Sequence, residues 1–222
     1  MTNNQAAKEA AEQGETALRK GKYREAEEKF TQAIHLTGGE EKSKYAWAFA
    51  HRGAARGEQR DYNNAKTDLT KAIALTGGEE NSTYAWAFAH RGRAYMIEKD
   101  YEKAKTDLTK AIALTGGEEK STYAWAFAHR GAAHYDNKEY DSAESDLNKA
   151  TNHFKGKGKY AWACAYRAMV YIQQGHLEDQ KTNYQRAMQL YRQAFYDIFS
   201  AIAHDVKVYT ESPEVKAILD LH

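Results

Sequence analysis

The sequence predicts an all-α protein in which helix-turn-helix repeats stack into a solenoid. The segment KTDLTKAIALTGGEE at residues 66–80 recurs unchanged at residues 105–119, an offset of 39 residues. Such a period is typical of solenoids, whose single units cannot bury their apolar faces alone and must stack on neighbours. Proline occurs once, at Pro213, while alanine, glutamate and lysine are abundant, and this composition favours helix throughout.

The first helix of a unit is expected over about residues 84–98 in the clearest copy. Residues spaced i, i+4, i+8 and i+11 make one face of this helix, and they are Tyr84, Phe88, Gly92 and Tyr95. Because Gly92 has no side chain, the helix can cross its partner closely at that point. The polar pair at residues 99–100 predicts a short break before the second helix.

The second helix is expected over residues 101–114. Its buried side is made of small and branched residues, namely Ala104, Leu108, Ala111 and Ile112. The helix is predicted to end at residues 115–117, where glycine can adopt the left-handed cap conformation. Ser121 or Thr122 then offers an N-cap to the next first helix.

The residue pattern of these two helices resembles the tetratricopeptide repeat. The motif Phe88-x2-Arg91-Gly92-x2-Tyr95, followed by Tyr101-x2-Ala104-x3-Leu108-x2-Ala111, carries the resemblance. It covers about residues 6–193 and implies a right-handed α-α superhelix of about five repeats. The chain departs from the family pattern in having arginine before the glycine, Phe in place of Trp, and glycine in place of the closing proline. Each linker is also five residues longer.

The resemblance divides the chain into repeats and an end segment. The expected repeats cover residues 6–39, 44–78, 83–117, 122–156 and 159–193, the last being degenerate. Residues 194–222 are expected to form C-terminal capping helices, because solenoids require polar-faced ends. An alternative is that this segment docks into a groove of its own chain or of a second chain.

A tryptophan occupies the same place in four successive first helices. The resemblance implies that this side of the first helices lines a concave groove in which peptides lie. The residues expected to line the groove are Trp47, Trp86, Ala89, Arg93, Met96, Trp125, Tyr135, Trp162 and Met169. An alternative is that each tryptophan packs between its own helix and the preceding repeat.

Arginines in the first helices recur together with aspartates in the second helices. We expect buried ion pairs within the repeats, because a partly buried guanidinium needs a partner. The predicted pairs are Arg52 with Asp68, Arg91 with Asp107, and Arg130 with Asp146. In the first repeat both members are absent, since Gln13 and Lys29 stand in their places.

Histidines precede these arginines at His51, His90 and His129. Successive copies are one repeat apart, too far to share a metal ion, so no metal site is predicted. We interpret the three histidines as surface residues that recur with the repeat.

Composition excludes several classes of function. The net charge is +1, which gives no global field for nucleic acid or an anionic membrane. The single cysteine, Cys164, excludes a disulfide framework. No apolar run approaches the length of a membrane span, and the N-terminus lacks the apolar core of a signal peptide, so a cytoplasmic protein is expected. No nucleophile, base and orienting group converge, so neither an enzyme nor a cofactor is predicted.

The predicted function is that of a scaffold or adaptor that binds a peptide or amphipathic helix of a protein partner in the groove. Family members that grip a terminal carboxylate use Lys and Asn on the first helices, whereas this chain has Ala50, Ala89 and Ala128 there. This difference favours an apolar or helical partner. The alternatives are a secretion or assembly chaperone for an apolar client, and a self-assembling structural protein that associates through the array ends or the C-terminal helices.

Overall fold

The protein is described by a computed structural model over residues 2–117, 123–153 and 161–174. Within these ranges the regular structure is helical, without strands. The expected capping helices at residues 194–222 and the second helix of the fifth repeat lie outside the described residues.

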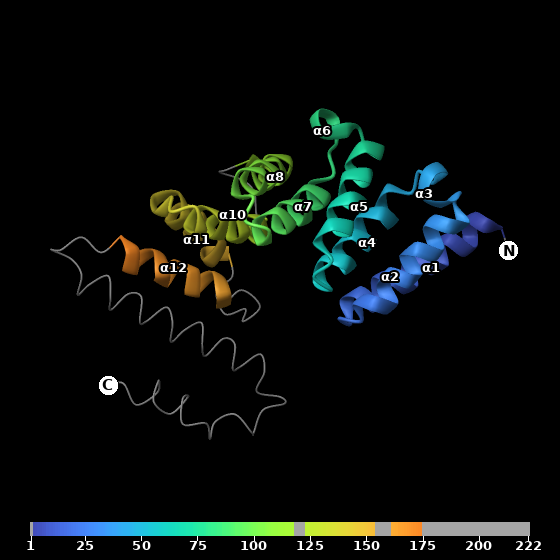
Figure 1. Cartoon of the computed structure of the whole chain (residues 1–222), viewed down its shortest axis with the longest axis horizontal. Helices are drawn as coiled ribbons and strands as arrows, with labels where there is room; N and C mark the ends of the chain where they lie inside the picture. Colours follow the sequence, from blue (N-terminus) through green and yellow to red (C-terminus); the bar gives the residue numbers. More distant parts are fainter. Residues whose placement is uncertain (1, 118–122, 154–160, 175–222) are drawn as a thin grey trace, which may run out of the picture.

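Long helices follow one another in antiparallel pairs (Figure 1). The pairs are α1 (Asn3–Arg19) with α2 (Tyr23–Leu36), α4 (Ala46–Glu58) with α5 (Tyr62–Leu75), α7 (Ala85–Ile97) with α8 (Tyr101–Leu114), and α10 (Ala124–Asp136) with α11 (Tyr140–His153). A further first helix, α12, spans Ala161–Gln173. The second helix predicted over residues 101–114 is α8, and the first helix predicted over residues 84–98 is one residue longer at each end than α7.

The turn inside each pair contains a residue in the left-handed backbone conformation. Lys99 has a φ of 65° and follows the last turn of α7. The amide of Asp100 donates to the carbonyl of Tyr95 at 2.9 Å, and that of Lys99 donates to Met96 at 3.0 Å. These two bonds form the Schellman motif that ends a helix. Asp100 then caps α8 by accepting a hydrogen bond from the amide of Lys103 at 3.4 Å.

The first two linkers between repeats contain short helices that the sequence pattern did not predict. Gly77 and Gly78 have φ angles of 123° and 77°, and the chain then forms α6 (Gly78–Asn81). The first linker forms α3 (Gly39–Lys42) in the same way. Because an L side chain rarely adopts such φ angles, glycine is needed where α2, α5 and α8 end.

The N-cap expected from Ser121 or Thr122 stays a prediction, but the two equivalent linkers do not use serine or threonine in this way. Ser121 and Thr122 lie outside the described residues, but their counterparts Ser82 and Thr83 precede the cap position, which Tyr84 occupies without a side-chain bond. Ser82 instead accepts from the amide of Tyr84 at 3.2 Å and lies 2.6 Å from the hydroxyl of Thr76. The serine therefore connects the two ends of the linker by hydrogen bonds and does not cap the following helix.

The core runs continuously through the stack of helices. The first helices α4, α7 and α10 each pack on their own second helix and on the second helix of the preceding repeat. Phe88, Leu108 and Ile112 are almost completely buried at these contacts, and burying one such side chain stabilises the fold by about 1.5–3 kcal/mol. A Cβ on Gly92 would lie 2.8 Å from the Cγ of Leu108, so the close crossing of α7 and α8 requires glycine.

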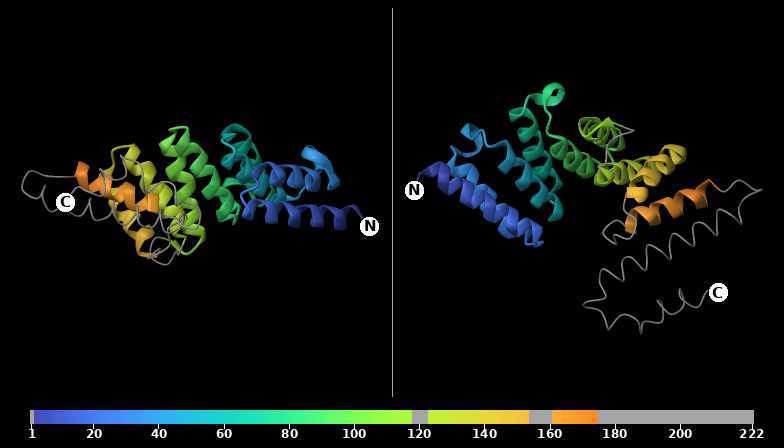
Figure 2. Two further views of the ribbon diagram at one scale, coloured as in Figure 1. Left: turned by 90° about the horizontal axis from the view of Figure 1, so that it is seen from below. Right: turned by 180° about the vertical axis from the view of Figure 1, so that it is seen from behind.

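The helix pairs succeed one another along an elongated array from the N-terminal end to α12 (Figure 2). Neighbouring first helices touch one another, as α4 touches α7 and α7 touches α10. The second helices α2, α5, α8 and α11 make no comparable contacts among themselves. The array therefore bends towards its first helices. In the described parts of the chain, no helix has the length and apolar character needed to cross a bilayer.

Candidate interaction site

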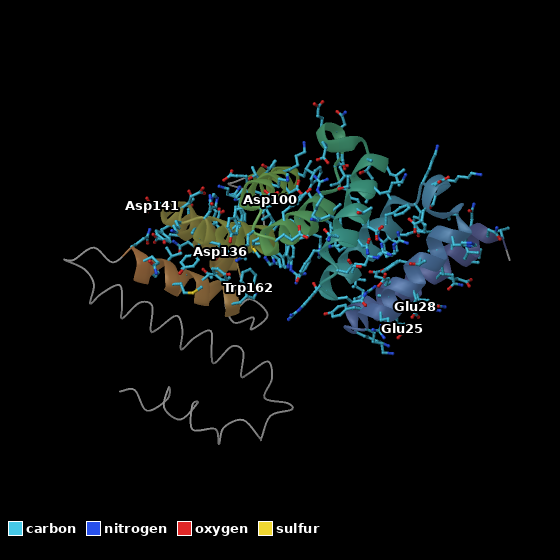
Figure 3. All side chains as sticks on the ribbon, in the orientation of Figure 1. Glu25, Glu28, Asp100, Asp136, Asp141 and Trp162 are labelled. Atoms are coloured by element: carbon cyan, nitrogen blue, oxygen red, sulfur yellow. The ribbon has the colours of Figure 1, made fainter. Side chains whose placement is uncertain are left out.

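A column of alternating tryptophan and histidine rings runs along the first helices. We call it the Trp–His column, and it consists of Trp47, His51, Trp86, His90, Trp125, His129 and Trp162. Within α7, the rings of Trp86 and His90 have centroids 4.0 Å apart. Between repeats, His51 stacks on Trp86 at 4.4 Å with an interplanar angle of 13°. Figure 3 shows Trp162, the last member, at the start of α12.

Local sequence and repeat stacking build the column together. A tryptophan and a histidine four residues apart lie above one another on one face of a helix. The next repeat then supplies its tryptophan to the free face of the histidine. At the first end, Phe30 of α2 contacts both Trp47 and His51 at 5.6 Å. The column goes no further in the first repeat because Lys8 and Glu12 stand at the matching places.

The tryptophans are packed on their ring faces but not fully enclosed. All four are partly buried, and each lies against the histidine of its own helix or of the preceding repeat. Tyr84 and Tyr123 add stacked rings beside Trp86 and Trp125, at 6.3 and 6.1 Å. The faces of each tryptophan ring thus pack between repeats, while another part of the same side chain stays exposed.

Two expectations about this face are wrong. Ala89 is completely buried, as are Ala50 and Ala128, so these alanines lie beneath the face and do not line it. Small side chains there allow neighbouring helices to approach. The histidines are not ordinary surface residues, because each is held between two tryptophans, and His129 is only 8% exposed.

The other residues expected in the groove lie around the column. Arg93 forms an ion pair with Glu58 of α4 and so bridges two repeats. Met96 is partly buried against the core, and Met169 is partly buried on α12. Tyr135 lies towards the neighbouring helices, with ring centroids 5.7 Å from Tyr140 and 5.6 Å from Tyr166.

Residues at spacings i, i+4, i+7 and i+11 place Trp86, His90, Arg93 and Ile97 on one stripe of α7. We call this stripe and its counterparts on α4, α10 and α12 the first-helix face. Ile97 is 37% exposed and is the one large hydrophobic residue that is exposed in the described parts of the chain. The first-helix face therefore combines ring edges with one apolar side chain open to solvent.

Buried arginines join helices within and between repeats. The guanidinium of Arg91 donates from Nε and Nη2 to the two carboxylate oxygens of Asp107, at 2.7 and 2.8 Å. Arg52 is bound to Asp68 in the same bidentate way, at 2.8 and 2.7 Å. Arg130 and Asp146 repeat the arrangement, at 2.7 and 2.8 Å. The bidentate geometry gives these pairs orientation as well as energy.

The linker glutamates complete these clusters, a role that the sequence pattern did not predict. Glu79, at the start of α6, accepts from Nη1 and Nη2 of Arg91 at 2.7 and 2.8 Å. Glu40 does the same for Arg52 at 2.6 and 2.9 Å. The hydrogen bond from Arg91 lowers the pKa of Glu79. The recurrence of Gly-Gly-Glu-Glu in the first three linkers was the signal that could have revealed this second carboxylate.

The column histidines favour the neutral state. Burial, together with the positive charge of Arg93, lowers the pKa of His90 to about 3. Burial also lowers the pKa of His51 and of His129. The Nδ1 atom of His129 is buried without a hydrogen-bond partner in the described structure, which suits an uncharged ring.

These shifts predict that acid destabilises the fold. An unfolded histidine titrates near pH 6.5, so between pH 6.5 and about 3 the unfolded chain binds more protons at position 90. The stabilisation is therefore complete above pH 6.5 and is lost as the pH falls. From pH 7 to pH 5, His90 is expected to reduce the free energy of unfolding by up to about 2 kcal/mol. Urea titrations at the two pH values measure this difference.

His90→Phe keeps a ring in the column but cannot be protonated, so the same comparison should give a smaller loss at pH 5. His35 is exposed on α2 and provides the control. If His35→Gln reduced the loss of unfolding free energy between pH 7 and pH 5 as much as His90→Phe does, the assignment of that loss to the column histidine would be contradicted.

Other parts of the described structure offer weaker candidates. Its histidines and carboxylates include no group of three that could hold a metal ion. A hollow of about 510 Å³ lies on the outer side of α1 and α2 and is lined mainly by charged and polar side chains. Gln13 and Lys29, which replace the paired Arg and Asp of the later repeats, line this hollow. The hollow is therefore the side of the first repeat on which no further repeat packs.

Comparisons with known proteins agree with this architecture. The sequence profile of the tetratricopeptide repeat family matches residues 87–116. The matched segment, which covers most of α7 and α8, is therefore a tetratricopeptide repeat. No curated protein sequence matches the chain.

Solved structures of MamA proteins are similar in fold. A MamA protein crystal structure aligns with a TM-score of 0.59 and 17% identity over 91% of this chain and 97% of that chain. The MamA fragment "41-end" from Desulfovibrio magneticus RS-1 has a TM-score of 0.62 and 19% identity, covering 85% and 96%. MamA MSR-1 has a TM-score of 0.63 and 17% identity, covering 85% and 98%. At such identities the likeness establishes the fold alone.

Proposed function

We propose that this protein is a non-enzymatic adaptor that binds a peptide segment of a partner protein along its first-helix face. The observation that carries the proposal is the Trp–His column, which continues across four repeats and leaves each tryptophan partly exposed. Partly exposed tryptophans held rigidly by their neighbours are favourable anchors, because little conformational entropy is lost when a ligand covers them. A cytoplasmic site of action belongs to the same proposal and is supported by the single cysteine.

The charges on this face favour an apolar partner over a terminal carboxylate. On α7 the cation beside the column is Arg93, and Glu58 already neutralises it. The corresponding positions on α4 and α10 are Ala54 and Ala132, both buried. A carboxylate lying on these three helices would therefore meet no free arginine or lysine at those positions.

Association through the array ends has weaker support. The outer side of α1 and α2 carries both acidic and basic side chains around a polar hollow. Such a surface lacks the apolar centre that stable interfaces usually have. A chaperone for an apolar client would use the same first-helix face, and it differs from an adaptor in the partner rather than in the site.

Photocrosslinking tests the proposed face without disturbing the column. A benzophenone amino acid at Ile97 is expected to trap the partner, because this position is exposed next to the column. The control places the same group at Asn63, which is exposed on α5. Covalent adducts in the cell extract are expected from position 97 and not from position 63. Adducts from position 63 alone, or equally from both, would refute the assignment.

Ile97→Glu provides a second test on the same face. A charge at this position should reduce partner capture at least threefold, while the free energy of unfolding changes by less than about 0.5 kcal/mol, as is usual for exposed sites. Capture is compared with that of Asn63→Glu, and stability is measured by urea titration. Unchanged capture in a stable Ile97→Glu protein would count against the proposal.

A further inference from the structure

Successive repeats are joined by polar contacts from three positions of a first helix. Arg56 and Gln59 of α4 donate to the carboxylate of Glu27 of α2, at 2.9 and 2.7 Å. Arg52 of α4 donates to the hydroxyl of Thr31 of α2 at 3.3 Å. These three positions of α4 therefore belong to the surface on which the preceding second helix lies.

The same surface is open on α1. An offset of 39 residues carries the three α4 positions to Gln13, Ala17 and Lys20, and all three line the hollow beside α1 and α2. α1 packs on α2 and only slightly on α4, whereas α4 packs extensively on both α2 and α5. Figure 1 shows α1 and α2 at one end of the array. The hollow therefore has the position of a helix-binding surface, and no helix of the described chain occupies it.

A polar stripe of α1 crosses this hollow. Its members follow the spacings i, i+4, i+7 and i+11 of one helix face and all line the hollow; they are Glu9, Gln13, Thr16 and Lys20. We call them the α1 stripe. It is acidic at one end, basic at the other, and symmetric in its spacing about the midpoint between Gln13 and Thr16. An identical helix running in the opposite direction would therefore place a carboxylate opposite an ammonium group at both ends, and an amide opposite a hydroxyl between them.

The two end charges of the α1 stripe are available to a partner. Lys20 is exposed and has no ion pair within the described residues. Glu9 is partly exposed and accepts a hydrogen bond from the side-chain amide of Gln5 at 3.2 Å, again without a cation among the described residues. The whole hollow is lined by three acidic and three basic side chains, so its net charge is zero. Two identical hollows would therefore not repel one another through net charge.

We propose that two copies of this chain associate through α1, with the α1 helix of each copy lying antiparallel in the hollow of the other. Glu9 then faces Lys20 of the partner subunit, and two-fold symmetry forms this pair twice. The partner's α1 helix runs in the direction that α2 has on α4, because consecutive long helices of the array are antiparallel. This contact goes beyond the proposed function, since it uses a different surface from the first-helix face.

This association is expected to be weak and sensitive to salt. The α1 stripe has no apolar centre, so charges and polar groups provide most of the affinity. Exposed ion pairs each contribute little, which places the dissociation constant on the order of 0.1–1 mM. Raising the NaCl concentration from about 50 to about 500 mM should weaken the dimer, because salt screens exposed charges.

Sedimentation equilibrium of the full chain measures the dissociation constant of the dimer. Lys20→Glu should raise it at least about tenfold, because symmetry turns two attractive contacts into two repulsive ones. Arg24→Glu makes the same change of charge at an exposed position of α2 outside the hollow, and should have little effect. If Lys20→Glu and Arg24→Glu have equal effects, or if the wild type stays monomeric at about 1 mM in low salt, the proposal is wrong.

Exchanging the two end charges is the sharper test. Glu9→Lys alone should weaken the dimer as Lys20→Glu does, whereas Glu9→Lys/Lys20→Glu should restore the wild-type dissociation constant to within about threefold. Circular dichroism verifies that each variant remains helical. A folded double variant that dimerises no better than the single variants would overturn the proposed pairing.

Carbodiimide crosslinking identifies the pair directly in the wild-type chain. This reagent joins a carboxylate to an amine that contacts it, and mass spectrometry locates the joined residues. Within one helix, Glu9 and Lys20 are about 16 Å apart along the axis, so a link between them has to connect two chains. The crosslinked dimer is expected to contain this link. A crosslinked dimer without it, or a dimer that Ile97→Glu dissociates, would place the contact on another surface and refute the proposal.

Discussion

Replacing Arg91 with alanine is expected to lower the free energy of unfolding by about 3–5 kcal/mol, because it leaves a buried carboxylate without its partner. The side chain of Asp107 is 6% exposed, and its ion pair with Arg91 is a bidentate contact. Urea titration followed by far-ultraviolet circular dichroism measures the change.

Two related variants separate the buried pair from the linker contact. Glu79→Ala removes a carboxylate that is 60% exposed, and is expected to cost less than about 1 kcal/mol. Arg91→Met/Asp107→Leu replaces the pair by apolar side chains and is expected to recover most of the loss. A loss of less than 1 kcal/mol in Arg91→Ala would contradict the view that these pairs fasten the helices.

Replacing Trp86 with alanine is expected to cost about 2–4 kcal/mol, somewhat less than for a fully enclosed aromatic residue. The indole lies 4.4 Å from His51 and 4.0 Å from His90, so its removal opens a gap between two repeats. Thermal unfolding followed by circular dichroism gives the change in Tm. Trp86→Phe should lose less, because a ring remains in the column.

Ile97→Ala is the control for this measurement. It lies on the same face of α7 but is 37% exposed, so its effect should stay within about 0.5 kcal/mol. If Trp86→Ala and Ile97→Ala had equal effects, Trp86 would not pack between repeats in the way described.

Much of the fold could be predicted because its determinants are local. The bounds of α8 depend on helical periodicity and on the turns at its two ends, all of which lie within a few residues of the helix. The left-handed glycines could be predicted for the same reason. The short helix α6 could not, since Glu79 is fixed by an arginine twelve residues further along the chain.

The candidate site was only partly predictable. Helical spacing put Trp86 and Arg93 on one stripe of the first helix, but the burial of Ala89 depends on how closely neighbouring helices approach. The stacking of His51 on Trp86 likewise depends on the spacing between repeats, which sequence periodicity does not contain. The role of the histidines was therefore missed, although their recurrence four residues after Trp47, Trp86 and Trp125 was visible.

The arginine clusters make neighbouring repeats unfold together. Arg91 belongs to α7, yet it also binds Asp107 of α8, Glu79 of the preceding linker, and Thr70 of α5 at 3.1 Å. When one repeat unfolds, a buried charge in the neighbouring repeat loses its partners. This loss raises the free energy of each boundary between a folded and an unfolded repeat. In a linear array, large boundary energies suppress partly melted states. The repeats that carry these clusters should therefore behave as one cooperative block rather than fray one at a time.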